Sequence, residues 1–587
     1  MVFDYIIEFK DKNEESVVHL DKIKGSKWSI YCINESCSFY ISPSKSKGEI
    51  YFFKNLIIFG KLFEKKDSKS FQVNSNSQLA ITLEELIKNY WGSYIAIIFD
   101  KDEVRVFRDP SASKESLWYK DNERRIIFSD IKSLYDKTKK RFEVNHEYIA
   151  STLYLSRVNN NRTALKNVFS LKPGYCLNIR DCKEECVWSP VQFANNRNKD
   201  QDIKVLEGKL KDTIIDCIKT WGDVYDSVLL NLSGGLDSSI VAICLKLFNN
   251  ITLNALNISF DSVVGDELKY AQELCEKYNI PLHVFKLIDP KINLKTRLSI
   301  FPYQHRPLKY GLGFECLEEE ELLLKDKKVE AIFSGCGGDV LFQSMNSIFI
   351  TQDYYRDHGL KGLFNISRRV AELTDRTVWD IFTKSISNKY FQGRKYLYEG
   401  SVNNELINKK YSLIIDNDYV SHPWHHSISN LNNGKKFQIA GLIDTENFYT
   451  YRKTSEYIDI VHPLLSQPII ELCLSIPSYI LTPNLINRGL LRNAFQSYLP
   501  TSTYLRRSKG KIGNFYDELI KYNYEDICST LNEGNLINSE ILSKEWLDQN
   551  MKKGIADQNI RMQLFQLMAT ETWLEKLMQE DFYEKNS

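Results

Sequence analysis

VLLNLSGGLDSS, residues 228–239, is an apolar run of strand-forming residues that leads directly into a turn of glycine and serine. Gly234 and Gly235 lack a Cβ atom, so the backbone can bend sharply there and turn its N–H groups toward an anion. Serine hydroxyls on both sides of the glycines can donate further hydrogen bonds. A strand, a glycine turn and the start of a helix together indicate a binding site for a phosphate group.

Asp237 stands at the predicted start of the helix that follows this turn. A carboxylate in this place can cap the helix or hold a hard cation such as Mg2+ against phosphate oxygens. The loop is not a Walker P-loop, because no lysine follows the glycines, and it lacks the third glycine of a dinucleotide fingerprint. It resembles the SGGxDS loop of the ATP pyrophosphatases, which cleave ATP between the α and β phosphates and leave AMP on a substrate.

Composition bounds the kind of protein that surrounds the loop. The 587 residues are 43% hydrophobic, enough for two or more domains with buried cores. The 77 basic and 76 acidic residues leave a net charge of +1, so neither nucleic acid nor an anionic membrane is an expected partner. The first residues lack a signal-peptide pattern, and no apolar run is long enough to span a bilayer, so we expect a cytoplasmic protein. Twelve cysteines without a CxxC pair are expected to be reduced, without a zinc site.

The chain divides into a β-rich first part and an α/β second part. Residues 92–100, 103–109 and 125–129 read as successive short strands joined by polar turns. The stretch 193–201 is polar and almost free of apolar residues, which is typical of a linker. The first domain is therefore predicted over residues 1–195.

After the linker, helical and strand patterns alternate, and this predicts a second domain over residues 202–587. A helix is expected over 205–221 and another over 267–278, and strands are expected at 228–232, 253–260 and 282–286. Such alternation predicts a parallel sheet, whose ligands bind beyond the carboxyl ends of the strands. The first glycine loop lies at such an end.

A second loop supports this placement. Residues 329–333 form another apolar strand pattern, and SGCGGD at 334–339 follows it directly. Two strand ends that each carry glycines and one aspartate can face the same nucleotide. Asp237 and Asp339 are then expected to supply carboxylates to one or two Mg2+ ions on the pyrophosphate.

The paired loops, behind a β-rich first domain, resemble those of the asparagine synthetase B superfamily. The motifs FRDP at 107–110 and FSDIK at 128–132 are similar to strand motifs of that family's glutaminase domain. The resemblance covers nearly the whole chain. It implies an N-terminal Ntn-hydrolase-like sandwich and a C-terminal α/β ATP-pyrophosphatase (PP-loop) synthetase domain with a parallel sheet and added helices. Glutamine-using members carry a cysteine nucleophile after the initiator methionine, whereas this chain has Val2. A valine side chain cannot attack an amide, so we expect a degenerate class II glutamine amidotransferase domain and another source of amine.

Superfamily members without that cysteine include β-lactam synthetases, carbapenam synthetases and lasso peptide cyclases. The second loop, HPW at 422–424 and HPLLS at 462–466 look most like the lasso peptide cyclases. These enzymes often carry histidine where this chain has Cys336. A thiol with an ordinary pKa near 8.5 is a poor proton acceptor at neutral pH, so Cys336 is expected to shape the pocket rather than act as the base.

Two further catalytic candidates follow from the resemblance. Glu372, in the predicted helix 360–373, stands at about the separation from Cys336 that the Tyr and Glu of the β-lactam formers show. An exposed helical glutamate is the alternative interpretation, and the amine can also lose its proton to water or substrate. RRSKGKIG at 506–513 resembles the segment whose lysine stabilises charge on the α-phosphate, which makes Lys509 the first candidate and Lys511 the second.

The sequence thus predicts an ATP- and Mg2+-dependent macrolactam synthetase of the lasso peptide cyclase type. The expected ATP-binding residues are Leu232, Ser233, Gly234, Gly235, Asp237, Ser238, Ser239, Ile258, Ser334 and Gly335. The expected partners are a precursor core peptide, a leader peptidase and a leader-recognition protein. A β-lactam synthetase or other small-molecule amide ligase is an alternative, which a small substrate cavity would favour. A catalytically inactive peptide-binding scaffold is the alternative of another class.

Overall fold

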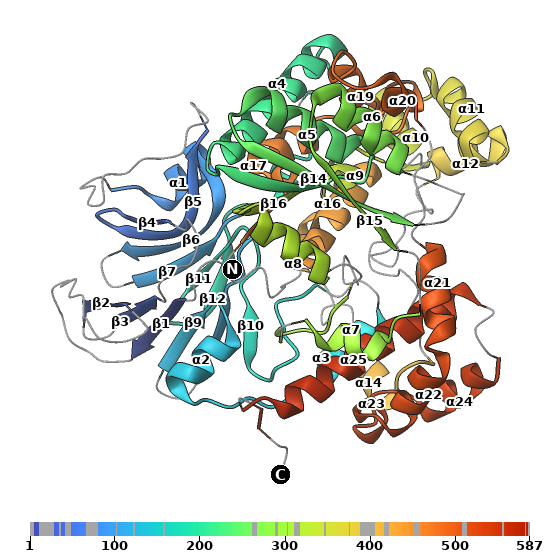
Figure 1. The fold of residues 1–587 in the computed structure, drawn as a ribbon. Coiled ribbons are helices and arrows are strands. Elements are labelled where there is room, and N and C mark those ends of the chain that lie inside the picture. The colour runs from blue at the N-terminus through green and yellow to red at the C-terminus, as the bar shows by residue number, and fades with distance from the viewer. Residues whose placement is uncertain are drawn as a thin grey trace.

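The computed structural model of the chain describes residues 5–10, 29–34, 37–41, 49–65, 80–100, 103–120, 124–155, 159–195, 198–260, 267–287, 291–301, 303–309, 317–344, 348–374, 376–387, 405–415, 422–449, 458–506, 513–553, 557–581 and 583–584. Figure 1 shows three parts: β-sheets of the N-terminal third at the left, a parallel sheet with helices at the top, and C-terminal helices in red below.

Two antiparallel sheets form the N-terminal part, named the N-terminal sandwich below. The first has the order β10 (Val168–Ser170), β8 (Leu117–Lys120), β9 (Arg124–Phe128), β1 (Tyr5–Lys10), β3 (Cys37–Ile41) and β2 (Ser29–Asn34). The second has the order β12 (Lys183–Cys186), β11 (Tyr175–Asn178), β7 (Glu103–Arg108), β6 (Tyr90–Asp100), β5 (Leu56–Glu64) and β4 (Glu49–Phe52). The strands predicted at 92–100, 103–109 and 125–129 are confirmed as β6, β7 and β9 to within two residues at each end.

The two sheets pack face to face because apolar side chains alternate along their strands. Tyr5 of β1 stacks on Phe59 of β5 with ring centroids 5.6 Å apart. Ile6, on the opposite face of β1, packs with the helices α2 (Ile131–Thr138) and α3 (His146–Tyr154). On the far side of the second sheet, Leu86 of α1 (Leu83–Asn89) belongs to a core with Ile58 and Ala96. The result is four layers: helices, sheet, sheet and helix.

The second part is a parallel sheet, as predicted from the alternating pattern. Its order is β15 (Leu282–Leu287), β14 (Thr252–Phe260), β13 (Ser227–Asn231), β16 (Ala331–Ser334) and β17 (Asp459–Val461). The chain builds outward from β13 to β15 on one side and then crosses to β16 and β17 on the other. The strand order therefore reverses between β13 and β16, which is where ligands bind in open α/β sheets.

Helices cover both faces of the parallel sheet. Val228 and Leu230 of β13 point to the face covered by α4 (Ile203–Gly222) and α5 (Leu236–Phe248), whereas Leu229 packs with Leu323 of α8 (Leu317–Asp326) on the other face. Burial on both faces explains why β13 reads as an unbroken apolar run in the sequence. The helix predicted over 267–278 is confirmed as α6 (Leu268–Tyr278).

The other helices of the described residues follow in chain order. They are η1 (Pro190–Gln192), α7 (Leu294–Ser299), α9 (Gly338–Leu341), α10 (Ile348–His358), α11 (Leu363–Thr374), α12 (Val378–Ile386), α14 (Lys409–Ser412), η4 (Pro423–Ser427), α16 (Asn433–Asp444), η5 (Thr445–Phe448), η7 (Pro463–Leu465), α17 (Gln467–Ser475), α18 (Ser478–Leu481), η8 (Pro483–Leu485), α19 (Gly489–Ala494), α20 (Thr501–Leu505), α21 (Gly513–Tyr522), α22 (Tyr524–Glu533), α23 (Asn535–Asn538), α24 (Lys544–Lys553) and α25 (Gln558–Gln579). Among the residues described, no helix combines the length and apolar character needed to cross a membrane.

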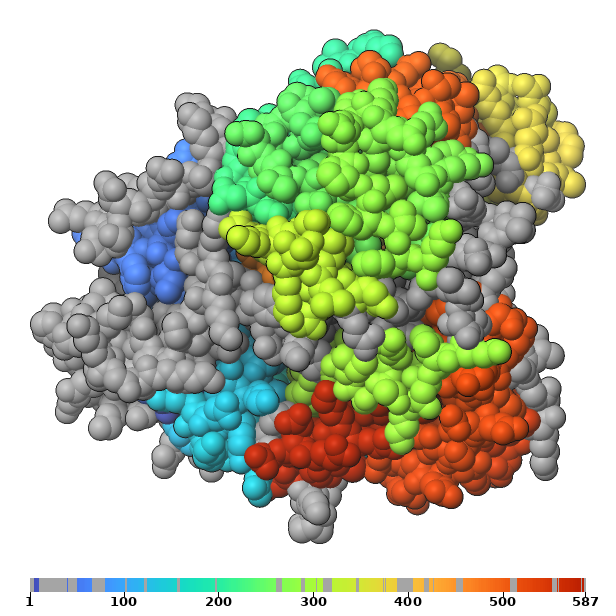
Figure 2. Space-filling view, in the orientation of Figure 1, coloured from blue at the N-terminus to red at the C-terminus, as the bar shows by residue number. Residues whose placement is uncertain are grey.

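The parts share continuous cores. Trp221 of α4 meets Phe63 of β5 edge to face, with ring centroids 4.9 Å apart. Lys295 of α7 pairs with Glu575 of α25 at 2.8 Å, and Figure 2 shows these two segments side by side at the lower surface. Within the predicted linker, Asn198 is buried, and its backbone N–H donates to the Ser475 carbonyl oxygen at 3.2 Å. The described part of the linker is therefore docked on the second part.

Candidate active site

The first loop follows β13, and its first residue is hydrogen-bonded to the neighbouring strand β14. The Leu232 N–H donates to the Leu256 carbonyl oxygen at 2.8 Å, and the Leu232 carbonyl oxygen accepts from the Asn257 side-chain amide at 2.7 Å. Gly234 then adopts φ 78°, and a Cβ atom there would lie 2.3 Å from the carbonyl oxygen of Glu267. Both the left-handed backbone and the close approach require glycine at this turn.

The loop leads into α5, and no side chain caps the first backbone N–H groups of this helix. Gly235 is the N-cap residue and makes no side-chain cap bond. Ser233 Oγ accepts the Gly235 N–H at 3.2 Å and lies 3.2 Å from Ser238 Oγ. Asp237 does not cap the helix, which was one of its two predicted roles. A helix N-terminus that lacks a side-chain cap is a suitable place for an anion.

The second loop leaves β16 beside the first. Asn231, the last residue of β13, is in register with Ser334, the last residue of β16. A Cβ atom on Gly335 would lie 2.5 Å from the Ser238 backbone nitrogen, and one on Gly338 would lie 2.3 Å from the Asp237 carboxyl carbon. The glycines of the second loop therefore let it press directly against the first loop and the start of α5.

One guanidinium joins the two aspartates. The Arg488 Nη1 donates to Asp237 Oδ2 at 2.5 Å and to Asp339 Oδ1 at 2.9 Å. Burial acts to lower the pKa of Arg488, but the two carboxylates outweigh it and raise this pKa above its usual value. Because both carboxylates bond to one nitrogen, their oxygens lie within two hydrogen-bond lengths of each other. The predicted convergence of Asp237 and Asp339 is seen in the geometry.

The other predicted residues differ in their relation to the loops. Ser239 is fully buried in the first turn of α5, and Ile258 is half-buried on β14, in register with Phe285. Cys336 is half-buried, and its N–H donates to Ser334 Oγ at 3.1 Å. Glu372 lies on α11 with its side chain 67% exposed, 3.9 Å from Arg368 on the same helix.

Lys509, Lys511 and Val2 lie outside the described residues. Arg506, the last residue described before the lysine segment, donates to the Gly234 carbonyl oxygen at 3.2 Å and to Glu267 Oε1 at 2.7 Å. Arg506, the first residue of the RRSKGKIG motif, therefore lies next to the first loop.

The HPLLS sequence lies under the second loop. Gly337 adopts φ 92°, and a Cβ atom there would lie 2.4 Å from a methyl group of Leu465. His462 Nδ1 lies 2.7 Å from Ser334 Oγ. Ser466 Oγ accepts from the Trp221 indole N–H at 3.1 Å. His462 and Leu465 of this motif therefore contact the second loop, and Ser466 contacts α4.

The HPW sequence lies against the N-terminal sandwich. Trp424 packs edge to face on Trp188, with ring centroids 5.8 Å apart. His422 Nδ1 accepts the Trp424 N–H at 3.1 Å, and burial holds the pKa of His422 well below its usual value. The motif thus helps to join the two parts of the chain.

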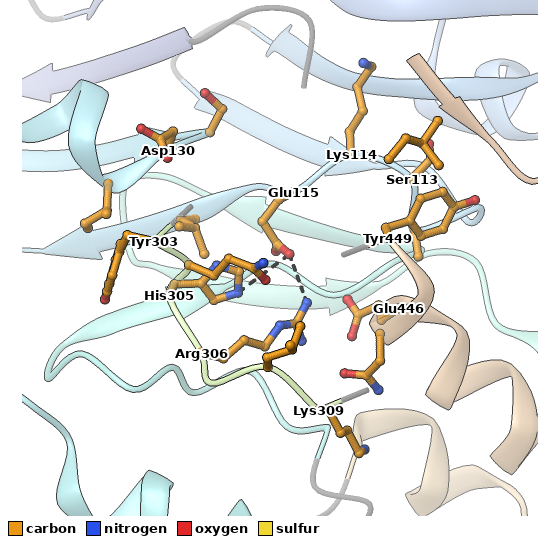
Figure 3. Close-up of a pocket in the computed structure, with 18 of the residues that line it drawn as sticks. Ser113, Lys114, Glu115, Asp130, Tyr303, His305, Arg306, Lys309, Glu446 and Tyr449 are labelled. Atoms are coloured by element: carbon orange, nitrogen blue, oxygen red, sulfur yellow. Dashed lines mark hydrogen bonds and ion pairs between the residues drawn. The ribbon is translucent and has the colours of Figure 1, made fainter. Parts of the chain in front are cut away.

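A polar cavity of about 130 Å³ lies between the N-terminal sandwich and the second part (Figure 3). Glu115 lies 3.2 Å from Arg306 and 3.7 Å from His305 in its wall. Burial acts to raise the pKa of Glu115, but Arg108, His305 and Arg306 lower it to about 2. Burial lowers the pKa of His305 to about 3, so this ring is neutral. Tyr449 also lines the cavity, and burial first, then Asp109, raises the pKa of its phenol.

Glu446 marks the point where the cavity wall carries buried ion pairs. Its carboxylate accepts from Arg108 Nη1 and from Lys172 Nζ, each at 2.9 Å. Burial acts to raise the pKa of Glu446, and Lys172, Arg108 and Arg306 together lower it far below its usual range. Both cations come from the N-terminal sandwich.

Sequence reasoning missed Arg488, Glu446 and the contact made by His462. Arg488 belongs to no glycine or aspartate motif, and Glu446 lies in a stretch of ordinary helical composition. His462 belongs to HPLLS, but the motif alone does not identify its contact with Ser334. The signal that could have found it is its position directly after the short strand β17, which ends beside β16.

The asparagine synthase family matches residues 223–575. An NH3-dependent NAD synthetase from Campylobacter jejuni, solved with a nitrate ion, is 16% identical over 40% of this chain and 96% of that chain, with a TM-score of 0.18. A structure described as the allosteric regulatory enzyme of purine biosynthesis is 10% identical over 49% of this chain and 75% of that chain, with a TM-score of 0.18. No curated protein matches the chain.

Proposed function

The chain belongs to the asparagine synthase family, and we propose that it closes a macrolactam ring in a ribosomal peptide. Membership of the family makes the chain an ATP-dependent carbon–nitrogen ligase. The observation that carries the ATP chemistry is the convergence of two glycine loops whose aspartates bond to one nitrogen of Arg488.

The proposed reaction has two steps. A side-chain carboxylate oxygen of the peptide attacks the α-phosphorus of ATP, the bond to the bridging oxygen of the β-phosphate breaks, and pyrophosphate leaves. The N-terminal amine of the same peptide then attacks the acyl carbon, the bond to AMP breaks, and the amine loses one proton. The products are an isopeptide ring, AMP and pyrophosphate.

Asp237 and Asp339 would hold Mg2+ in this reaction. The donor set fits the ion, because Mg2+ takes carboxylate oxygens and the two carboxylates already converge on one cationic group. When bound, the ion would neutralise charge on the pyrophosphate. The uncapped start of α5 and the hydroxyls of Ser233 and Ser238 would contact the phosphates.

Lys509 is proposed to stabilise charge at the α-phosphate, with Lys511 as the second candidate. Support comes from Arg506, whose bonds to Gly234 and Glu267 fix the start of the lysine segment at the first loop. A positive charge that interacts more strongly with the transition state than with the substrate accelerates the chemical step.

The peptide substrate is supported by sequence motifs. HPW at 422–424 and HPLLS at 462–466 resemble lasso peptide cyclases, and Cys336 is proposed to shape the acceptor pocket. Glu372 remains a candidate base only if the peptide reaches its exposed side chain. We propose that the N-terminal sandwich is a degenerate glutaminase-like domain, so the amine comes from the peptide rather than from glutamine.

The test combines the enzyme with a candidate precursor peptide, a leader peptidase, a leader-recognition protein, ATP and Mg2+. The expected product is lighter by one water than the core peptide and forms together with AMP and pyrophosphate. Replacing ATP by α,β-methylene-ATP, in which the bond to be cleaved is blocked, should abolish the product. AMP release with small β-amino acids and not with any peptide would favour the small-molecule ligase. Absence of AMP and pyrophosphate with every substrate would contradict the proposal.

A further inference from the structure

We infer that the N-terminal sandwich positions the second ATP loop, through Glu446 and His462 acting on Ser334. Glu446 and His462 are positioning residues, which are not expected to touch the nucleotide. It rests on the role of the second loop in ATP binding and is independent of the peptide substrate.

The first step is the hydrogen bond between His462 and Ser334. His462 Nε2 lies 3.4 Å from the Phe448 carbonyl oxygen, and a carbonyl oxygen can only accept, so Nε2 carries the proton. In the tautomer with the proton on Nε2 alone, Nδ1 is an acceptor, and the Ser334 hydroxyl, 2.7 Å away, donates to it. Ser334 Oγ keeps its lone pairs for the Cys336 N–H, which it accepts at 3.1 Å. His462 therefore fixes the direction of the hydroxyl that shapes the turn.

The second step runs from His462 to the N-terminal sandwich. Phe448 is the last residue of η5, and Glu446 lies two residues earlier on the same short helix. Each Glu446 oxygen accepts one bond from the sandwich, Oε1 from Arg108 and Oε2 from Lys172. Figure 3 shows Glu446 and Tyr449 on one side of the cavity, on the segment that carries η5. The position of the Phe448 carbonyl is thereby tied to strands of the sandwich.

Burial makes the ion pairs of Glu446 with Arg108 and Lys172 hard to break. The Arg108 and Lys172 side chains are each 1% exposed, and that of Glu446 is 3% exposed. An unpaired charge that is excluded from water has a large free-energy cost, so breaking one of these ion pairs without replacing it is strongly unfavourable. Arg108 Nη1 also donates to the Leu171 carbonyl oxygen at 2.7 Å, which fixes the guanidinium itself. A displacement of η5 would therefore require the ion pairs to separate.

The first experiment uses two amides that each keep one half of the His462 contact. Asn in place of His462 puts an oxygen near the Nδ1 position and keeps an acceptor for Ser334. Gln puts its amide near the Nε2 position, which keeps the donor to Phe448 and loses the acceptor for Ser334. The probe is α,β-methylene-ATP with Mg2+, titrated calorimetrically, and the melting temperature of each variant is recorded alongside.

We expect His462→Gln and Ser334→Ala each to weaken binding of the probe about tenfold, the effect of one lost hydrogen bond. His462→Asn should bind within about threefold of the wild type, because it rescues the acceptor. Equal weakening by Asn and Gln, or no weakening by Gln, would overturn the inference while leaving the ligase intact. A wild-type protein that does not bind the probe would overturn it together with the nucleotide role of the loop.

The second experiment tests the connection to the sandwich by a double-mutant cycle. Lys172→Met removes one of the two bonds on Glu446 and should weaken probe binding about threefold in the wild-type background. In the His462→Gln background the same substitution should add no further weakening, because the link to Ser334 is already broken. A purely structural Lys172 would lower the melting temperature in both backgrounds and leave probe binding unchanged, which would overturn the inference.

Discussion

The two glycine loops at the sheet edge differ in what holds them. The first loop is fixed by the strand and helix that follow it in the chain: Leu232 bonds to β14, and Gly234 packs on the start of α6. The second loop is held by residues far away, since the His462 side chain that meets Ser334 lies 128 positions along the chain. The turn of the first loop is held mainly by the elements that follow it in the chain, whereas the second loop is held by tertiary packing.

The two loops should therefore respond differently to substitutions at distant positions. The first loop depends on β14 and α6, on the glycines of the second loop, and on Arg488 and Arg506, which bond to Asp237 and to the Gly234 carbonyl oxygen. The second loop depends on η5, on His462 and Leu465, and through them on the N-terminal sandwich. We therefore expect substitutions within the first loop to have larger effects than those within the second. We expect the second loop to be the more sensitive to substitutions in the residues that surround it.

The largest effect should come from the aspartates. Asp237→Asn should lower ATP turnover by a factor on the order of 10³, and Asp339→Asn by a factor on the order of 10². The Asp237 side chain is 11% exposed and that of Asp339 is 38% exposed, so the charge on Asp237 acts through less water. Release of AMP with a competent substrate measures both. A larger loss for Asp339→Asn would break the proposed ranking of the loops.

Next in size is the glycine contact between the loops. Gly338→Ala places a methyl carbon 2.3 Å from the Asp237 carboxyl carbon, which forces that side chain to move, so it should weaken binding of α,β-methylene-ATP by about 10²-fold. Gly208→Ala is the matched control, because no atom lies within 4 Å of a Cβ at this helical site. It should leave binding unchanged and stabilise the fold by about 0.5–1 kcal/mol. Equal binding by both variants would contradict direct contact between the loops.

Arg488→Met removes the cation shared by the two loops. The two carboxylates then lose the buried cation that joins them, and the free energy of unfolding should fall by about 2 kcal/mol. Because Mg2+ can replace the guanidinium between them, saturating Mg2+ should raise the melting temperature of Arg488→Met more than that of the wild type. Thermal denaturation with and without Mg2+ checks this. Equal Mg2+ shifts in both proteins would argue against a metal site at these aspartates.

The first loop and the parallel sheet were predictable because their signals are local. Burial on both faces makes β13 and β16 unbroken apolar runs, and the glycines mark the turns. The pairing of Asp237 with Asp339 followed from one topological rule, that parallel strands end at the same edge.

The contacts of the second loop could not be read from the sequence. Nothing in the pattern around Glu446 predicts that two cations of the N-terminal sandwich bond to it, because the pairing depends on how two distant parts dock. The same holds for Arg488, whose partners are 149 and 251 positions away. Periodicity reports which face of an element is buried and does not identify the element on the other side.

The smallest effect is a selective loosening of the second loop in acid. The pKa of Glu446 and of Glu115 is lowered in the folded protein, to about 2 for Glu115, so both give stability that is present above about pH 4.5 and lost as pH falls toward 2. Asp109 works in the opposite sense, because burial raises its pKa to about 6 and its contribution is lost as pH rises from about 4 to 6.

Since Glu446 fixes η5 under the second loop, acid should release this loop before the first. Hydrogen exchange, corrected for intrinsic rates, should show that protection of residues 334–342 falls between pH 5 and pH 3 by about threefold more than that of residues 232–245. Glu115→Gln, which removes one carboxylate of the cluster, should make this difference less dependent on pH. Equal loss of protection in both loops would show that acid loosens the sheet edge as one unit, and that the second loop is no more dependent on its surroundings than the first.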